Sequence, residues 1–189
     1  AIIGYTEILQ EDAEAAARHH ELQDIERVLA AARQLLRLIN DILDLSKIES
    51  GRADLVLADA DIEALINEAV ATIGPAAAKG GNSVRIDIEP GLGAVRTDPF
   101  KLNQCLLNLL SNAAKFTEGG EIEVRARREL RGRAQFIRID VADTGIGIDP
   151  ELQERLFTPF AQADVQTARR FGGTGLGLAI TRRIMQALG

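Results

Sequence analysis

The chain has 189 residues and a formal net charge of −6, with 46% hydrophobic but only 4% aromatic residues. This is enough apolar material for one or two domains with cores of leucine, isoleucine, valine and alanine, and the acidic balance argues against nucleic acid as a partner. No apolar run reaches the ~20 residues that cross a bilayer and no signal peptide is evident, so we expect no membrane contact from this stretch.

The first 50 residues are expected to form a helical hairpin. Apolar residues recur every three or four positions, which is a heptad pattern, at Leu22, Ile25, Leu29, Ala32, Leu36, Ile39 and Leu43. Further apolar residues widen this stripe, as in a helical bundle, at Val28, Leu35 and Ile42. The partner that the chain offers is a helix over residues 1–17, and a single hairpin would leave much of the stripe exposed. We therefore expect residues 1–50 to dimerise into a four-helix bundle, with packing on the next domain as the alternative.

A second domain is expected over residues 53–189, and helices within it are marked by sequence signals. The segment 62–73 has a helical pattern that ends at a glycine–proline pair, residues 74–75. Thr-Asp-Pro at 97–99 predicts the start of another helix, because a capping side chain precedes a proline in the first turn.

Three segments of this domain alternate apolar and polar residues as half-buried strands do, at 84–88, 122–126 and 137–141. The second and third strands are expected to pair across a polar loop around Gly132. A helical hairpin followed by a domain of helices and a small sheet makes the expected fold class α+β.

The helix expected from residue 99 contains the sequence LLNLLSNAAKFT (106–117). Its apolar stripe, which must be buried, consists of Leu102, Leu106, Leu109 and Ala113. Cys105 lies at the edge of this stripe, where a small core residue is expected. At 100° per residue, Asn108, Asn112 and Lys115 share a narrow polar face. Asparagine is a poor helix former, and its neutral oxygen suits Mg²⁺ beside phosphates; an ordinary solvated face is the alternative.

Two glycine-rich sequences follow. In DTGIG (143–147), Asp143 can accept from an adenine amino group while Gly145 and Gly147 let the backbone come close to a ring; a simple turn is the alternative. GGTGLGL (172–178) leads into a helix, where free N–H groups and the helix dipole attract anions. Each sequence alone is a weak signal, but in this order with the asparagine-bearing helix they indicate a nucleotide-phosphate site.

The ordered set NLLSNAAKFT, DTGIG, LFTPF (156–160) and GGTGLGL resembles the asparagine, first glycine, phenylalanine and second glycine boxes of sensor histidine kinases. LLRLINDILDLSKIESG (35–51) resembles the second helix of that family's dimerisation domain, and AIIGYTEIL (1–9) resembles the stretch after its phosphoacceptor motif. The resemblance covers essentially the whole chain. It implies that residues 53–189 form a Bergerat-type ATP-binding domain, an α/β sandwich shared with type II topoisomerases, a chaperone and mismatch-repair ATPases.

The resemblance also implies roles for individual residues. Asn112 would ligate Mg²⁺, with Asn108 supporting it and Lys115 on the phosphates, and Asp143 would hold the adenine amino group. The backbone beside the adenine ring would come from Gly145 and Gly147. The triphosphate would be lined by Gly173, Thr174, Gly175 and Gly177.

The segment 161–171 is short of apolar residues and is bounded by a proline and by glycines. We interpret it as a lid over the nucleotide. Arg170, or its neighbour Arg169, at the end of this lid would reach the γ-phosphate.

The function that the resemblance implies is that of a histidine kinase core, which binds MgATP and transfers the γ-phosphoryl group to a histidine. The expected partners are a second copy of the chain and a response-regulator receiver domain, in the cytoplasm; membrane anchoring of the full-length protein is left open. One alternative is a Bergerat-type ATPase clamp, in which a glutamate acts as general base where this chain has Asn108. Further alternatives are a non-catalytic ATP-sensing or docking module and a protein-serine kinase of the same fold.

Both ends of the chain are expected to be cut. In the family, further strands follow the last helix, and the phosphoacceptor histidine lies a few residues before the position of Ala1. His19 and His20 lie between the two helical patterns without the acceptor sequence of the family. We therefore interpret them as loop residues and not as phosphorylated histidines.

Overall fold

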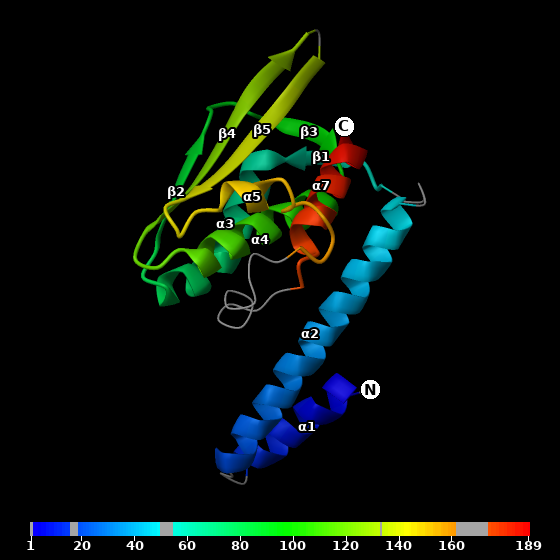
Figure 1. Cartoon of the computed structure of the whole chain (residues 1–189), viewed down its shortest axis with the longest axis vertical. Helices are drawn as coiled ribbons and strands as arrows, with labels where there is room; N and C mark the ends of the chain where they lie inside the picture. Colours follow the sequence, from blue (N-terminus) through cyan, green and yellow to red (C-terminus); the bar gives the residue numbers. More distant parts are fainter. Residues whose placement is uncertain (1, 16–18, 50–54, 133, 162–173) are drawn as a thin grey trace. The chain divides into compact units, whose positions relative to one another are not determined.

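The computed structural model of the chain describes residues 2–15, 19–49, 55–132, 134–161 and 174–189 (Figure 1). The chain divides into two compact units, Ala1–Lys47 and Ile48–Gly189. A helical pair comes first and a domain of helices and sheets follows, so the expected α+β class is confirmed. None of the described helices combines the length and apolarity that a membrane crossing requires.

The first unit consists of α1 (Ile2–Ala15) and α2 (His19–Glu49), which are joined by an ion pair between Arg33 and Glu7 at 2.8 Å. Few of its described apolar side chains are buried. Large apolar side chains that remain 47–71% exposed are Ile2, Tyr5, Ile8, Leu9, Val28, Leu35, Leu36, Ile39, Ile42 and Leu43. The apolar stripe of α2 is therefore largely uncovered in a single chain, as expected for half of a bundle.

The two histidines differ from their expected setting. Because α2 begins at His19, the backbone of His19 and His20 forms the first turn of a helix, and the interpretation of both as loop residues is wrong. The helix begins three residues before the apolar stripe, whose first residue is Leu22, because adding residues to the end of a helix that has already formed is much easier than starting one.

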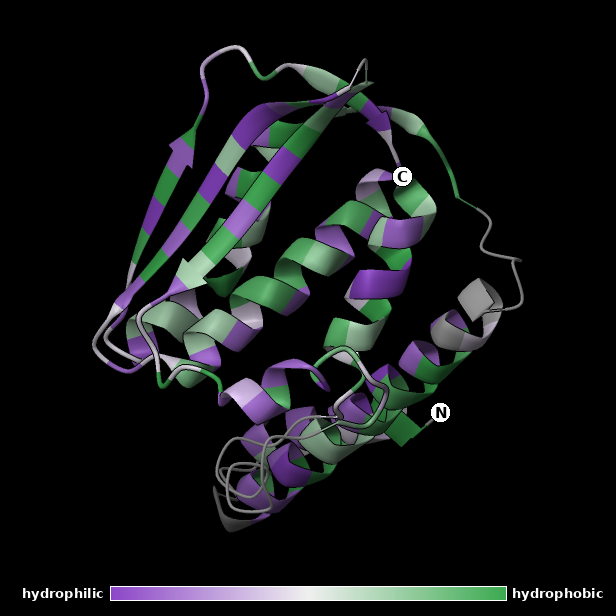
Figure 2. Cartoon of the chain, turned by 45° about the horizontal axis from the view of Figure 1, so that its top comes forward, coloured by the Kyte–Doolittle hydropathy of each residue, from purple (hydrophilic) through white to green (hydrophobic). Residues whose placement is uncertain are grey.

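The larger sheet of the second unit has the strand order β2-β4-β5 (Figure 1). Its strands are β2 (Ser83–Ile88), β4 (Glu121–Arg131) and β5 (Ala134–Asp143), with β2 parallel and β5 antiparallel to β4. Val124 lies opposite Val141, so the expected pairing of the second and third strands is confirmed. Hydrophilic and hydrophobic residues alternate along these strands (Figure 2), which is the pattern of a sheet with one buried face.

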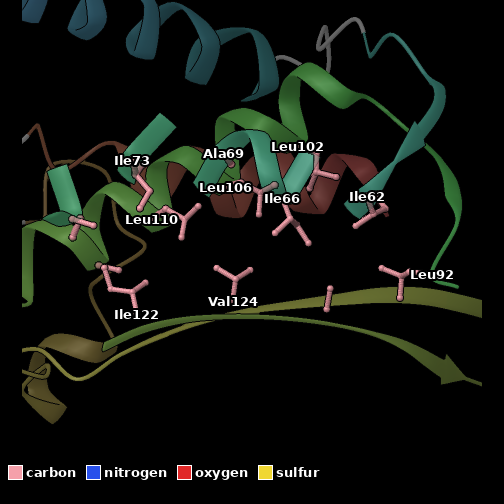
Figure 3. Close-up of a cluster of buried hydrophobic side chains, with 14 residues drawn as sticks. Ile62, Ile66, Ala69, Ile73, Leu92, Leu102, Leu106, Leu110, Ile122 and Val124 are labelled. Atoms are coloured by element: carbon pink, nitrogen blue, oxygen red, sulfur yellow. The ribbon is translucent and has the colours of Figure 1, made fainter. Parts of the chain in front are cut away.

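Two helices, α3 (Ile62–Lys79) and α4 (Pro99–Phe116), cover that face. Their side chains point toward Ile122 and Val124 of β4 (Figure 3). Members of this core that are at most 1% exposed are Ile62, Ile66, Ala69, Ala77, Leu110, Ile122, Val124 and Ala126. Burying one leucine or isoleucine stabilises a fold by roughly 1.5–3 kcal/mol, so this layer fixes the position of α4 against the sheet.

The expected end of α3 at residue 73 is wrong, because the helix continues through Gly74 and Pro75 to Lys79. Proline removes the hydrogen bond to the carbonyl four residues earlier, and both Ala71 and Pro75 lie on the exposed side of the helix, where water can serve that carbonyl. The apolar face meanwhile continues, since Ile73 and Ala77 are both buried. Tertiary burial therefore outweighs the local stop signal.

A second, two-stranded sheet was not expected from the sequence. It pairs β1 (Ala58–Asp61) with β3 (Ala94–Thr97) in antiparallel fashion. Each strand leads into a capped helix: Asp61 Oδ1 accepts from Ala64 N at 3.1 Å, and Asp98 Oδ1 accepts from Phe100 N and Lys101 N at 3.0 Å each. The predicted start of a helix at residues 97–99 is thereby confirmed.

Asp98→Ala is expected to lower the free energy of unfolding by roughly 2 kcal/mol. The change removes the N-cap of α4 and also the acceptor of Val56 N, which lies 2.9 Å from Asp98 Oδ2. Asp61→Ala is the matched control, because Asp61 caps α3 through one hydrogen bond and is exposed, and about 1 kcal/mol is expected there. Urea denaturation of both variants checks the difference; equal losses would contradict it.

Candidate functional site

The polar face of α4 brings together three residues that the sequence singled out. Asn108, Asn112 and Lys115 are all half-buried, whereas Leu106 and Leu110 on the opposite side of the helix are buried in the core. One face of the helix thus packs on the sheet, and the other face carries two amides and one ammonium group.

Asn108 is held by the last described helix, α7 (Gly177–Leu188). Its Nδ2 donates to Thr181 Oγ1 at 2.8 Å, and Thr181 is buried. A Cβ atom on Gly177 would collide with Asn108 Oδ1, so a residue without a side chain is needed for this close approach of the two helices. Asn108 therefore fastens α4 to the glycine-rich entry of α7.

Cys105 belongs to the same helix contact. Its Sγ lies 3.9 Å from the carbonyl oxygen of Thr181, and burial raises the pKa of its thiol to about 11. A thiol that stays protonated at neutral pH is a poor nucleophile. The expected role of Cys105 as a small core residue is confirmed.

Lys115 is partly withdrawn from solvent. Burial lowers the pKa of its ammonium group, and Nζ lies 4.7 Å from the centroid of the Phe116 ring. A charge at a partly desolvated position interacts more strongly with an opposite charge than one in bulk water. Lys115 is therefore suited to an anionic ligand such as a phosphate group.

Asp143 ends β5, and its carboxylate is fixed from one side. Its Oδ1 accepts from Gly145 N at 2.9 Å and from Thr117 Oγ1 at 3.4 Å. A Cβ atom on Gly145 would collide with the carbonyl oxygen of Phe116, and Ile146 N donates to that same carbonyl at 3.2 Å. The first glycine-rich sequence is thereby fastened to the C-terminal end of α4.

The second glycine-rich sequence is described from Thr174 onward. Gly175 has a positive φ of 69°, and a Cβ atom there would lie 2.8 Å from the carbonyl oxygen of Ala161. Its own carbonyl accepts from Phe160 N at 3.0 Å, while Thr174 Oγ1 accepts from Leu176 N at 3.1 Å. These contacts set the backbone at the N-terminus of α7, the type of helix end that attracts anions.

Some expected site residues lie outside the described part of the chain. They are Gly173, Arg169, Arg170 and all but the first residue of the segment 161–171 that was interpreted as a lid. Gly147, in contrast, is described and has a positive φ of 71°, a conformation that glycine adopts most readily.

Three residues of the site were missed from the sequence. Thr181 and Thr117 hydrogen-bond to Asn108 and Asp143, and Asn82 bonds to the backbone of Thr117 and Gly120. Short polar residues of this kind are common in turns and helix ends, so nothing local in the sequence distinguished them.

Comparison with known proteins gives two family matches. Residues 1–51 match the His Kinase A (phospho-acceptor) domain, and residues 97–189 match the histidine kinase-, DNA gyrase B-, and HSP90-like ATPase. The chain is 36% identical over 190 residues to the signal transduction histidine-protein kinase BarA of Escherichia coli (strain K12). It is 38% identical over 191 residues to the circadian input-output histidine kinase CikA of Synechococcus elongatus. Both alignments cover 100% of this chain but only 20% and 25% of those relatives, so the chain spans about a fifth to a quarter of their length.

Solved structures agree. Full-length ShkA in complex with AMPPNP is 33% identical with a TM-score of 0.75, over 87% of this chain and 33% of that one. The catalytic domain of the histidine kinase ThkA is 26% identical with a TM-score of 0.59, over 71% of this chain and 82% of that one. The expected Bergerat-type architecture is confirmed by these neighbours.

Gly177→Ala is expected to lower the free energy of unfolding by roughly 1–3 kcal/mol, because the added methyl group overpacks the contact with Asn108. In an Asn108→Ala background the obstructing amide is gone, so the same change should cost at least about 1 kcal/mol less. Gly74→Ala is the control, since a Cβ atom there meets nothing within 4 Å. Denaturant unfolding of the four variants checks this; a loss at Gly177 that is independent of Asn108 would contradict it.

Proposed function

Because this chain belongs to the sensor histidine kinase family, we propose that it is the kinase core of such a protein. It binds MgATP in the domain that follows the helical pair and transfers the γ-phosphoryl group to a histidine of a phosphoacceptor domain. The phosphoryl group then passes to an aspartate of a response-regulator receiver domain. The reaction takes place in the cytoplasm, where ATP is available.

The observation that carries this proposal is that one helix connects all three sequence motifs. Asn108 of α4 contacts Gly177 and Thr181, and Phe116, at the C-terminal end of the same helix, accepts from Ile146 of the first glycine-rich sequence. Eight residues of helix separate these contacts, a length of roughly 12 Å. The base and the phosphates of one nucleotide can therefore be held from the two ends of a single polar face.

We assign the ligand contacts as follows. Asp143 accepts from the adenine amino group, with Gly145 and Gly147 beside the ring. Lys115 and the backbone of residues 174–177 bind the phosphates. Asn112 ligates Mg²⁺ through its amide oxygen, because a hard cation beside phosphates takes few protein ligands and prefers oxygen.

The side chain of Asn108 favours phosphoryl transfer over hydrolysis of ATP. An amide has no useful basicity, and Nδ2 of Asn108 is bonded to Thr181 while Gly177 packs against its Oδ1. A clamp-type ATPase needs a general base near this position to activate water. The chain instead offers positioning and charge neutralisation, which are the main requirements of phosphoryl transfer.

The helical pair is proposed to complete its core with a second copy of the chain. Apolar side chains remain exposed on both helices, such as Leu9, Leu36 and Leu43. Those of α2 recur at heptad spacing, which suits another helical pair of the same kind. The homodimer thereby forms a four-helix bundle.

Asn112→Ala is expected to weaken ATP binding at least roughly tenfold when Mg²⁺ is present, because the metal loses its protein oxygen. Without Mg²⁺ the variant and the wild type should bind ATP alike. Ser111→Ala is the matched control: Ser111 is exposed on the neighbouring position of α4 and bonds only locally to Asn108 O in the described structure. Calorimetry with and without Mg²⁺ measures the effect, and an unchanged metal dependence in Asn112→Ala would refute the assignment.

The chain is also expected neither to hydrolyse ATP nor to transfer its γ-phosphoryl group to His19 or His20. Asn108 cannot act as a base, and His19 and His20 lie in the first turn of α2, outside the acceptor sequence of the family. With ATP labelled in its γ-phosphate, we predict negligible phosphate release and no phosphohistidine at position 19 or 20. Steady release of phosphate that Asn108→Ala abolishes would favour an ATPase clamp. Labelled phosphate on His19 or His20, found by mass spectrometry, would show that this histidine is a phosphoacceptor after all.

A further inference from the structure

Thr117 is a polar residue that is almost completely buried, with an exposed fraction of 1%. It follows the last turn of α4, where its backbone N donates to Ala113 O at 3.1 Å. Its hydroxyl group donates to Asp143 Oδ1 at 3.4 Å. A buried hydroxyl needs a partner to offset its loss of water, and a carboxylate is a strong one. This contact joins the end of α4 to the end of β5.

The backbone of Thr117 is itself fixed from a third element. Asn82, just before β2, is 9% exposed, and its Nδ2 donates to Thr117 O at 2.8 Å while its Oδ1 accepts from Gly120 N at 3.0 Å. A Cβ atom on Gly120 would lie 2.6 Å from Thr117 Cγ2, so the backbone of Gly120 packs closely against the methyl group of Thr117. The position of the hydroxyl is therefore set by the fold before any ligand arrives.

The two carboxylate oxygens of Asp143 therefore differ in the hydrogen bonds that they accept. Oδ1 of Asp143 receives both donors, the hydroxyl of Thr117 and the backbone N of Gly145. Oδ2 is then the oxygen left to accept from a ligand, in an orientation that costs little to adopt on binding. An exposed aspartate without these donors would have to be ordered by the ligand itself.

We propose that Thr117, supported by Asn82, is a positioning residue that makes the site selective for a purine bearing an amino group. The inference rests on the proposed function, in which Asp143 accepts from that amino group. A purely structural Thr117 would cap α4 and fill space, and valine would serve both purposes equally well because it has the same shape.

The test compares the binding of MgATP, of the purine riboside triphosphate that lacks the 6-amino group, and of inorganic triphosphate. The preference of the wild type for ATP over the analogue without the amino group should fall about three- to tenfold in Thr117→Val. The affinity for inorganic triphosphate should stay unchanged, and Thr117→Ser should keep the preference. Thr72→Val is the control, because its hydroxyl bonds within α3, to Glu68 O.

If the valine variant fails to fold, the pair Thr117→Ser and Thr117→Ala isolates the hydroxyl without a change of branching. A preference that survives in both Thr117→Val and Thr117→Ala while Asp143→Asn abolishes it would overturn the role of Thr117 alone. An equal loss of affinity for all three ligands would overturn it as well, since it indicates that Thr117 is a purely structural residue. If neither the wild type nor Asp143→Asn prefers ATP over the analogue without the amino group, the assignment of Asp143, on which the inference rests, would be wrong.

Discussion

The placement of α4 is the constraint on which the rest of the second unit depends. Its leucine face is packed on the β2-β4-β5 sheet, where residues such as Leu106 and Leu110 are buried and hold the helix in place. Asp98 fixes where the helix begins. The polar face of α4 consequently has one orientation, and both glycine-rich sequences contact this helix.

This arrangement gives the glycines more than one purpose. Gly145 and Gly177 are needed because backbone and side-chain atoms of α4 occupy the space of a Cβ atom. Gly147 and Gly175 are needed for their positive φ. A sequence rich in glycine before a helix is usually explained by the approach of a phosphate, but here close packing between α4 and α7 accounts for part of the pattern.

Features with a local physical cause were predicted well: the capped start of α4, its polar face, and the alternation that pairs β4 with β5. The apolar face of α4 was predicted except at one position, because Leu110 and not the expected Leu109 belongs to the core. The end of α3 was predicted wrongly because Gly74 and Pro75 are local stop signals that continued burial overrides. The contacts of Thr117, Asn82 and Thr181 could not be predicted, since they join residues 26, 35 and 73 positions apart. The site residues were found from their order along the chain, and the residues that orient them became visible only in three dimensions.

If α4 and the two glycine-rich sequences form one nucleotide site, hydrogen–deuterium exchange of the whole chain should show it most directly. Exchange would be measured with and without Mg²⁺ and the ATP analogue AMPPNP. Binding should slow exchange together in the backbone of residues 108–116, 143–147 and 174–178, because one ligand bridges all three. Slowing at the last of these alone, or no change at 143–147 when the analogue is bound, would show that the three segments do not act as one site.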